Sequence, residues 1–110
     1  MHHSNIQGLE IIFPVRTEYL GVITENQSLM VNAHSVLFLN EGNTVMKVKG
    51  KQPVNPDGDY LIIGAYGDFR AFVKDRYNLE FVTEGVENPI NKVHVFIEIA
   101  EGFPYPTNTL

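Results

Sequence analysis

The sequence predicts an all-β protein, built as an antiparallel β-sandwich with jelly-roll or Greek-key connections. Val, Ile and Thr supply 27 of the 110 residues, and another 12 are aromatic. Both kinds of side chain suit the half-buried surface of a pleated sheet. Ala occurs only four times, and no stretch has the apolar spacing of three and four residues that indicates a helix. Gly, Pro and Asn are scattered evenly and divide the chain into short runs.

Each run of β-forming residues is a candidate strand, and neighbouring runs can belong to one bent strand. The candidates, in chain order, are Leu9 to Val15, Tyr19 to Thr24, Ser28 to Ala33, Val36 to Leu39, Thr44 to Lys49, Tyr60 to Ala65, Phe69 to Val73, Asn78 to Val82 and Lys92 to Ala100. No helical crossover separates them, which disfavours a parallel sheet.

The breaks between runs contain turn formers. Residues 40–43 (Asn-Glu-Gly-Asn) predict a hairpin with Gly42 at positive φ. In residues 56–59 (Pro-Asp-Gly-Asp), Pro56 presets φ and Gly58 is the expected left-handed residue. Gly67 and Asp68 predict a further tight hairpin. The longest loops are expected at residues 50–59 and 83–91.

Alternation within the runs assigns side chains to faces. Lys47, Lys49 and Lys51 share one face, with Met46 and Val48 on the other, which indicates one wet and one dry face. In the last run, Val93, Val95, Ile97 and Ile99 form the apolar face. The run Tyr60 to Ala65 is apolar on both faces, so we expect a central strand there. Pro14 marks an edge or a bulge in the first run.

Length and composition indicate one domain with two short arms. A chain of 110 residues with 44% hydrophobic and 19% charged residues is long and apolar enough for one core. We divide it into an N-terminal arm (residues 1–8), a β-sandwich (9–101) and a C-terminal extended arm (102–110). Pro104 and Pro106 favour an extended conformation of the C-terminal arm. Phe103 and Tyr105 supply apolar anchors there, so these four residues are the candidate partner-binding residues.

Residues that support catalysis or metal binding are sparse. The absence of Cys excludes a thiolate nucleophile and a Cys-ligated zinc. His34 and Ser35 are adjacent, and strand neighbours point to opposite faces, so they form no dyad. His34 and Glu41 resemble half of a cupin metal motif but lack its His-x-His pair. We therefore expect no cofactor, no metal and no enzymatic activity; a small cupin-like β-barrel enzyme is the second alternative function.

Ligand binding is the first alternative function. Tyr66, Tyr77 and the loop at Asp57 and Asp59 are the candidate residues for a carbohydrate or small ligand. The Asp-Gly-Asp turn resembles part of a calcium loop, but an ordinary tight turn is the favoured explanation. The net charge of −5 makes nucleic-acid binding an unfavoured function. No apolar run approaches the length of a membrane span or a signal peptide.

In size, acidity, lack of Cys and Pro-containing arms, the whole chain resembles the small accessory virion proteins of tailed bacteriophages, of the capsid-decoration or stapling type. The resemblance implies a non-catalytic structural protein that binds and stabilises neighbouring capsid subunits and that itself forms an oligomer, a dimer being favoured. It also implies a location in the virion; without it, the cytoplasm is the expected location. No diagnostic motif accompanies the resemblance, and no functional residue is transferred from it.

Overall fold

The fold is known from a computed structural model, which describes residues 2–6, 9–13, 15–64, 73–100 and 108. All regular structure in these residues is β, which confirms the predicted fold class. The strands are β1 (His2–Ile6), β2 (Leu9–Phe13), β3 (Val15–Ile23), β4 (Gln27–Ala33), β5 (Ser35–Asn40), β6 (Val45–Val48), β7 (Tyr60–Gly64), β8 (Val73–Val82) and β9 (Val93–Ala100).

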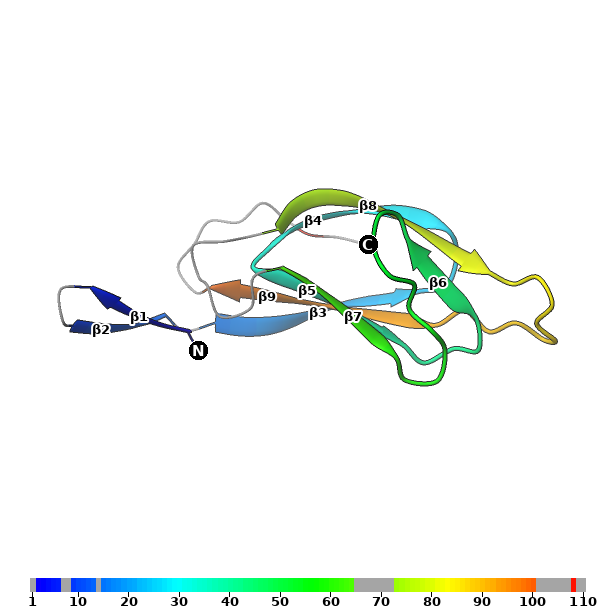
Figure 1. The fold of residues 1–110 in the computed structure, drawn as a ribbon, viewed down its shortest axis with the longest axis horizontal. Helices are drawn as coiled ribbons and strands as arrows, with labels where there is room; N and C mark the ends of the chain where they lie inside the picture. Colours follow the sequence, from blue (N-terminus) through cyan, green and yellow to red (C-terminus); the bar gives the residue numbers. More distant parts are fainter. Residues whose placement is uncertain (1, 7–8, 14, 65–72, 101–107, 109–110) are drawn as a thin grey trace.

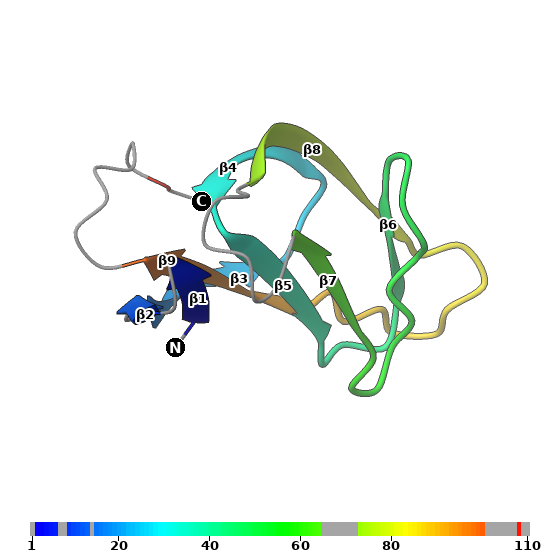
Figure 2. The ribbon, with the colours of Figure 1, turned by 60° about the vertical axis from the view of Figure 1, so that its left-hand side comes forward.

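Seven strands form a sandwich of two antiparallel sheets, and β1 and β2 form a separate hairpin that extends from one end of it (Figure 1). The four-stranded sheet has the order β3-β9-β5-β7, and the three-stranded sheet has the order β4-β8-β6. Figure 2 shows β4 and β8 arching over the four-stranded sheet. The predicted sandwich is therefore confirmed.

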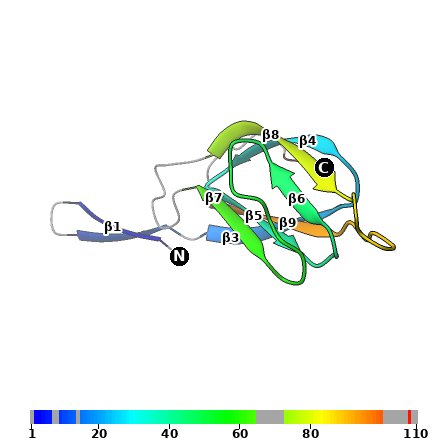
Figure 3. The same cartoon turned by 45° about the vertical axis from the view of Figure 1, so that its right-hand side comes forward.

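Successive strands of the sandwich alternate between the two sheets, from β3 in one to β4 in the other and so on to β9. This connectivity is that of a jelly roll. An eight-stranded jelly roll has one more strand beside β6. Here a single antiparallel bridge between Met46 and Val54 takes that position, and the loop that carries Val54 folds back along β6 (Figure 3).

The core lies between the sheets and is built from alternate residues of each strand. Met46 and Val48 point inward while Lys47 and Lys49 are exposed, as predicted. The inward residues of β9 are also the predicted ones, namely Val93, Val95, Ile97 and Ile99. Phe38 of β5 and Tyr77 of β8 meet edge to face across the core, with ring centroids 6.5 Å apart.

Several strand boundaries differ from the prediction. The run Leu9 to Val15 is divided into β2 and β3, and the run starting at Asn78 belongs to a longer strand that begins at Val73. Residues 2–6 of the expected N-terminal arm form β1, paired with β2 from His2↔Phe13 to Ile6↔Leu9. The two strands pair through main-chain hydrogen bonds, which polar residues form as well as apolar residues do. A polar segment that was expected to be an arm can therefore be a strand. Positions 65–72, with the predicted Gly67–Asp68 hairpin, lie outside the described residues.

Residues 40–43 do not form the predicted hairpin. They connect β5 in one sheet to β6 in the other, and Gly42 is absent from the glycines with positive φ. A Cβ at Gly42 would lie 2.2 Å from the carbonyl oxygen of Ile90. Close backbone packing, not a left-handed conformation, therefore requires glycine at this position. At residues 56–59 the expected left-handed Gly58 is present, with φ of 96°, and Asp57 precedes it with φ of 65°.

Candidate interaction surface

The outer face of the four-stranded sheet carries two rows of mostly apolar side chains. Strand register aligns Val22, His94, Leu39 and Tyr60 in one row and Tyr19, Phe96, Leu37 and Ile62 in the next. We call these eight side chains the apolar face. Tyr60 is 60% exposed, Tyr19 53% and Ile62 48%. These fractions are high for large hydrophobic side chains of a regular sheet, which normally point into a core.

The size of the apolar face suits the centre of a protein interface. Two rows across four strands cover roughly 260 Å², because strands lie ~4.8 Å apart and same-face residues ~6.8 Å apart. A standard interface buries about 800 Å² per partner, with an apolar centre and a polar rim. The apolar face thus has the area of such a centre.

A chain of polar contacts fixes the aromatic residues at one end of the apolar face. The Tyr19 hydroxyl lies 2.8 Å from Nδ1 of His94, and Nε2 of His94 lies 3.3 Å from a carboxylate oxygen of Glu41. The Tyr19 ring also packs against Phe96, with centroids 5.1 Å apart. In the neutral imidazole tautomer with a proton on Nε2, Glu41 faces the N–H group and Nδ1 accepts from the Tyr19 hydroxyl. The exposed Tyr19 ring is therefore held in one orientation.

The third row of the same sheet is small and polar, and it creates a hollow beside the apolar rows. Register aligns Thr17, Glu98, Ser35 and Gly64. A pocket of about 200 Å³ lies here, walled by Leu37, Ile62 and Phe96 on one side and lined by Thr17, Ser35 and Glu98 on the other. The hollow gives the apolar face a recess that a protruding side chain of a partner can enter.

The sequence contained one signal for this surface. The run Tyr60 to Ala65 was expected to be a central strand because it is apolar on both faces, but β7 is the last strand in the order of the described sheet. Its inner residues Leu61 and Ile63 pack on the core, while Tyr60 and Ile62 face outward. The apolar character of the run on both faces thus corresponds to one face packed on the core and one face exposed.

The structure separates the residues predicted for ligand binding. Tyr77 is 6% exposed and belongs to the core, so it offers no surface platform. Asp57 is exposed in the loop before β7, and Oδ2 of Asp59 accepts a hydrogen bond from the amide of Asn55 at 2.9 Å. This bond is internal to the turn. Tyr66 and the arm residues Phe103, Pro104, Tyr105 and Pro106 lie outside the described residues.

His34 and Glu41 do not form a common site. They flank opposite ends of β5, which places them about 23 Å apart along the strand. His34 is buried, with 1% exposure, and Glu41 contacts His94 instead. Among the residues that the structure describes, no cluster of three His, Asp or Glu side chains has the geometry of a metal site.

Comparisons with protein families, with curated proteins and with solved structures found no match to this chain. In the described parts of the chain, no helix has the length and apolar character required to cross a membrane.

Proposed function

We propose that this chain is a non-catalytic assembly protein of a virion, which binds and stabilises neighbouring capsid subunits through the apolar face. The observation that supports this most is the concentration of exposed hydrophobic side chains on one sheet. Of the large hydrophobic residues that are exposed in the described chain, Tyr19, Val22, Tyr60 and Ile62 lie on this face, and Met30 and Ile90 lie elsewhere.

Burial of the apolar face would favour the binding of a partner. Covering about 260 Å² on each side at ~25 cal/mol per Å² contributes roughly 13 kcal/mol before the costs of association. Tyr side chains are frequent among the residues that dominate interface energies, and the Tyr19 ring is already fixed by His94 and Phe96. A rigid aromatic loses little conformational entropy on binding.

The partner is proposed to be protein rather than a small ligand. The apolar rows are broad and lie on a sheet, and the adjoining pocket of about 200 Å³ is smaller than most pockets that enclose a whole ligand. The C-terminal arm supplies a second proposed contact, through Phe103, Pro104, Tyr105 and Pro106. A sheet face and an extended arm together suit a protein that joins adjacent subunits of a shell.

The test is co-sedimentation with shells assembled from a capsid protein encoded beside this chain's gene. Wild-type protein is expected to sediment with the shells, and the Tyr60→Ser/Ile62→Ser double variant is expected to remain in the supernatant. Met30→Ser is the matched control, because Met30 is exposed on the other sheet. Binding by the double variant equal to wild type would contradict the proposal.

Light scattering on the isolated chain tests the accompanying proposal of a homodimer. A dimer that leaves the apolar face free for capsid subunits has twice the monomer mass of 12.4 kDa in both the wild type and the double variant. A double variant with the monomer mass would show that two copies cover the apolar face, and would contradict binding of capsid subunits there. A wild-type protein with the monomer mass would show that no second copy covers the apolar face, and would contradict the homodimer.

A further inference from the structure

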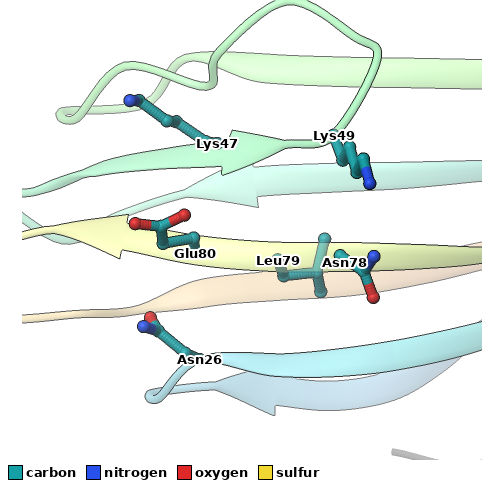
Figure 4. Close-up of a pocket in the computed structure, with 6 residues that line it drawn as sticks. All are labelled: Asn26, Lys47, Lys49, Asn78, Leu79 and Glu80. Carbon is teal, nitrogen blue, oxygen red and sulfur yellow. The ribbon is translucent and has the colours of Figure 1, made fainter.

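The opposite side of the sandwich has a different chemistry. A groove of about 440 Å³ crosses the outer face of the three-stranded sheet, lined by Asn26, Lys47, Lys49, Asn78, Leu79 and Glu80 (Figure 4). Lys47 lies on β6 and Lys49 just after it, Asn78 and Glu80 lie on β8, and Asn26 precedes β4. The volume is within the range of pockets that hold small ligands.

The two lysines of this groove are available to an anion. In the described chain, neither Lys47 nor Lys49 forms an ion pair. Lys47 is the register partner of Glu80 across the strands, yet its ammonium group points away from that carboxylate in Figure 4. Arg76 and Lys74 follow on the same outer face of β8. This face is therefore basic although the chain carries a net charge of −5.

The other polar side chains of the groove lie at two different ends of it, each end with one of the lysines. Figure 4 shows Asn26, Lys47 and Glu80 toward one end of the groove and Asn78 with Lys49 toward the other. The side-chain oxygen of Asn26 already accepts from the amide of Phe81 at 2.8 Å, so its NH₂ group is the part that is left to donate to a ligand. Glu80 can only accept, from hydroxyl groups. The end with Asn26, Lys47 and Glu80 thus suits the hydroxyl groups of a ligand, and the end with Asn78 and Lys49 suits an anionic group.

We propose that this groove binds an acidic sugar of the uronic acid class. The carboxylate of the sugar pairs with Lys49 and the amide of Asn78, and its hydroxyls donate to Glu80 and accept from Asn26 and Lys47. Among the residues that the structure describes, no aromatic side chain lines the groove, so these residues offer a neutral sugar no stacking platform and its affinity is expected to be lower. The negative charge of Glu80 disfavours the binding of phosphate, because phosphate lacks the several hydroxyl groups by which a sugar donates hydrogen bonds to Glu80. The proposal is independent of the apolar face.

The test is a titration of the full chain by NMR, following backbone amides of β6 and β8 with sodium glucuronate, glucose and inorganic phosphate. Glucuronate is expected to shift these signals, and more weakly at about 500 mM salt, because exposed charges are then screened. Lys49→Gln should weaken glucuronate binding by about two- to fivefold, as expected for loss of a solvent-exposed ion pair. Lys92→Gln is the matched control, since Lys92 is exposed away from the groove.

Glu80→Gln separates a sugar site from a general anion site. It should weaken glucuronate and strengthen phosphate, because one of the two acceptor oxygens is replaced by an NH₂ donor and a negative charge is lost. Equal binding of glucose and glucuronate, tighter binding of phosphate than of glucuronate, or no response to glucuronate would each overturn the proposal. Tyr60→Ser/Ile62→Ser should bind glucuronate as the wild type does, which keeps this result separate from the test of the apolar face.

Discussion

Tyr77 shows how one residue couples stability to pH. Its ring is packed against Phe38 in the core. Burial, with a smaller contribution from the negative charge of Asp75, raises the pKa of the Tyr77 phenol above its usual value of 10.0. Both causes act against the charged phenolate. The folded state therefore favours the neutral phenol more strongly than the unfolded state does.

The consequence is a loss of stability in alkaline solution. The contribution of Tyr77 is fully present below its unfolded pKa of about 10 and is lost as the pH rises through the higher folded pKa. We expect the free energy of unfolding of the wild type, from urea denaturation, to fall more steeply above pH ~10 than that of Tyr77→Phe. Equal slopes for the two proteins would contradict this expectation.

Gly42 gives a second prediction for a single residue. A Cβ there would meet the Ile90 carbonyl oxygen at 2.2 Å and the Lys92 amide nitrogen at 2.8 Å, and both are backbone atoms. Gly42→Ala is expected to lower the free energy of unfolding by about 3 kcal/mol, at the upper end of the cost of overpacking. Gly50 is the control, because a Cβ there meets nothing within 4 Å and only its positive φ of 79° opposes alanine. Gly50→Ala should cost about 1 kcal/mol. Equal losses would refute the packing explanation.

The connection between β5 and β6 depends on Asn40. Its NH₂ group donates to the carbonyls of Thr44 at 2.7 Å and Val54 at 3.0 Å, and its oxygen accepts from the amide of Gly42 at 3.0 Å. Asn40 is fully buried. One side chain therefore satisfies backbone groups of the connection and also fixes Val54, whose bridge to Met46 replaces the missing strand.

Asn40→Ala should disrupt this element. It removes the partner of the buried Gly42 amide and Thr44 carbonyl, while the Val54 carbonyl keeps its bond from the Met46 amide, so the loss of stability is expected to be about 2 kcal/mol or more. Amide hydrogen exchange should show faster exchange at Val54, whose amide bonds to the Met46 carbonyl at 2.8 Å. The exposed Asn55→Ala should change neither quantity. Unchanged protection of Val54 in Asn40→Ala would show that the bridge forms without Asn40.

Sequence patterns predicted these elements to different degrees. Alternation identified the inward residues of β6 and β9, because burial of one sheet face imposes period two. It did not distinguish a hairpin from a connection between sheets at residues 40–43, because both use the same turn formers. It also missed the apolar face. From the sequence alone, an apolar side chain such as Ile62 is predicted to lie in the core, whether the protein itself or a partner covers it. The Tyr19–His94–Glu41 contacts join residues far apart in sequence, and no local spacing indicates them.

At the scale of the whole molecule, the C-terminal arm meets the sandwich at one described point. The side-chain amide of Asn108 accepts from the Asn32 amide at 2.6 Å and donates to the Asn32 carbonyl at 2.9 Å. Asn32 lies on β4, the end strand of the three-stranded sheet in the described order. The side chain thus satisfies backbone groups at a sheet edge, which otherwise remain open to pairing with other chains.

Deleting residues 102–110 is expected to weaken co-sedimentation with capsid shells while leaving the sandwich folded. The deletion removes the proposed anchors Phe103 and Tyr105 together with the Asn108 bonds, and we expect a stability cost of about 1–3 kcal/mol from the latter. Circular dichroism should retain its β signature. Asn108→Ala is the control for the lost hydrogen bonds, and it should bind shells as the wild type does. Full binding by the truncated chain would exclude the arm from the interface.

The alternation of strands between the two sheets also affects how the chain folds. In the residues that the structure describes, no two consecutive strands of the sandwich pair, and β3 pairs with β9. Every ladder must therefore close a long loop before its contacts stabilise it, which predicts slow folding, in milliseconds to seconds. During synthesis, β3 and β5 remain without β9 until Val93–Ala100 has left the ribosome. We expect the hydrophobic side chains of β3 and β5 to stay exposed until then, and the nascent chain to bind chaperones.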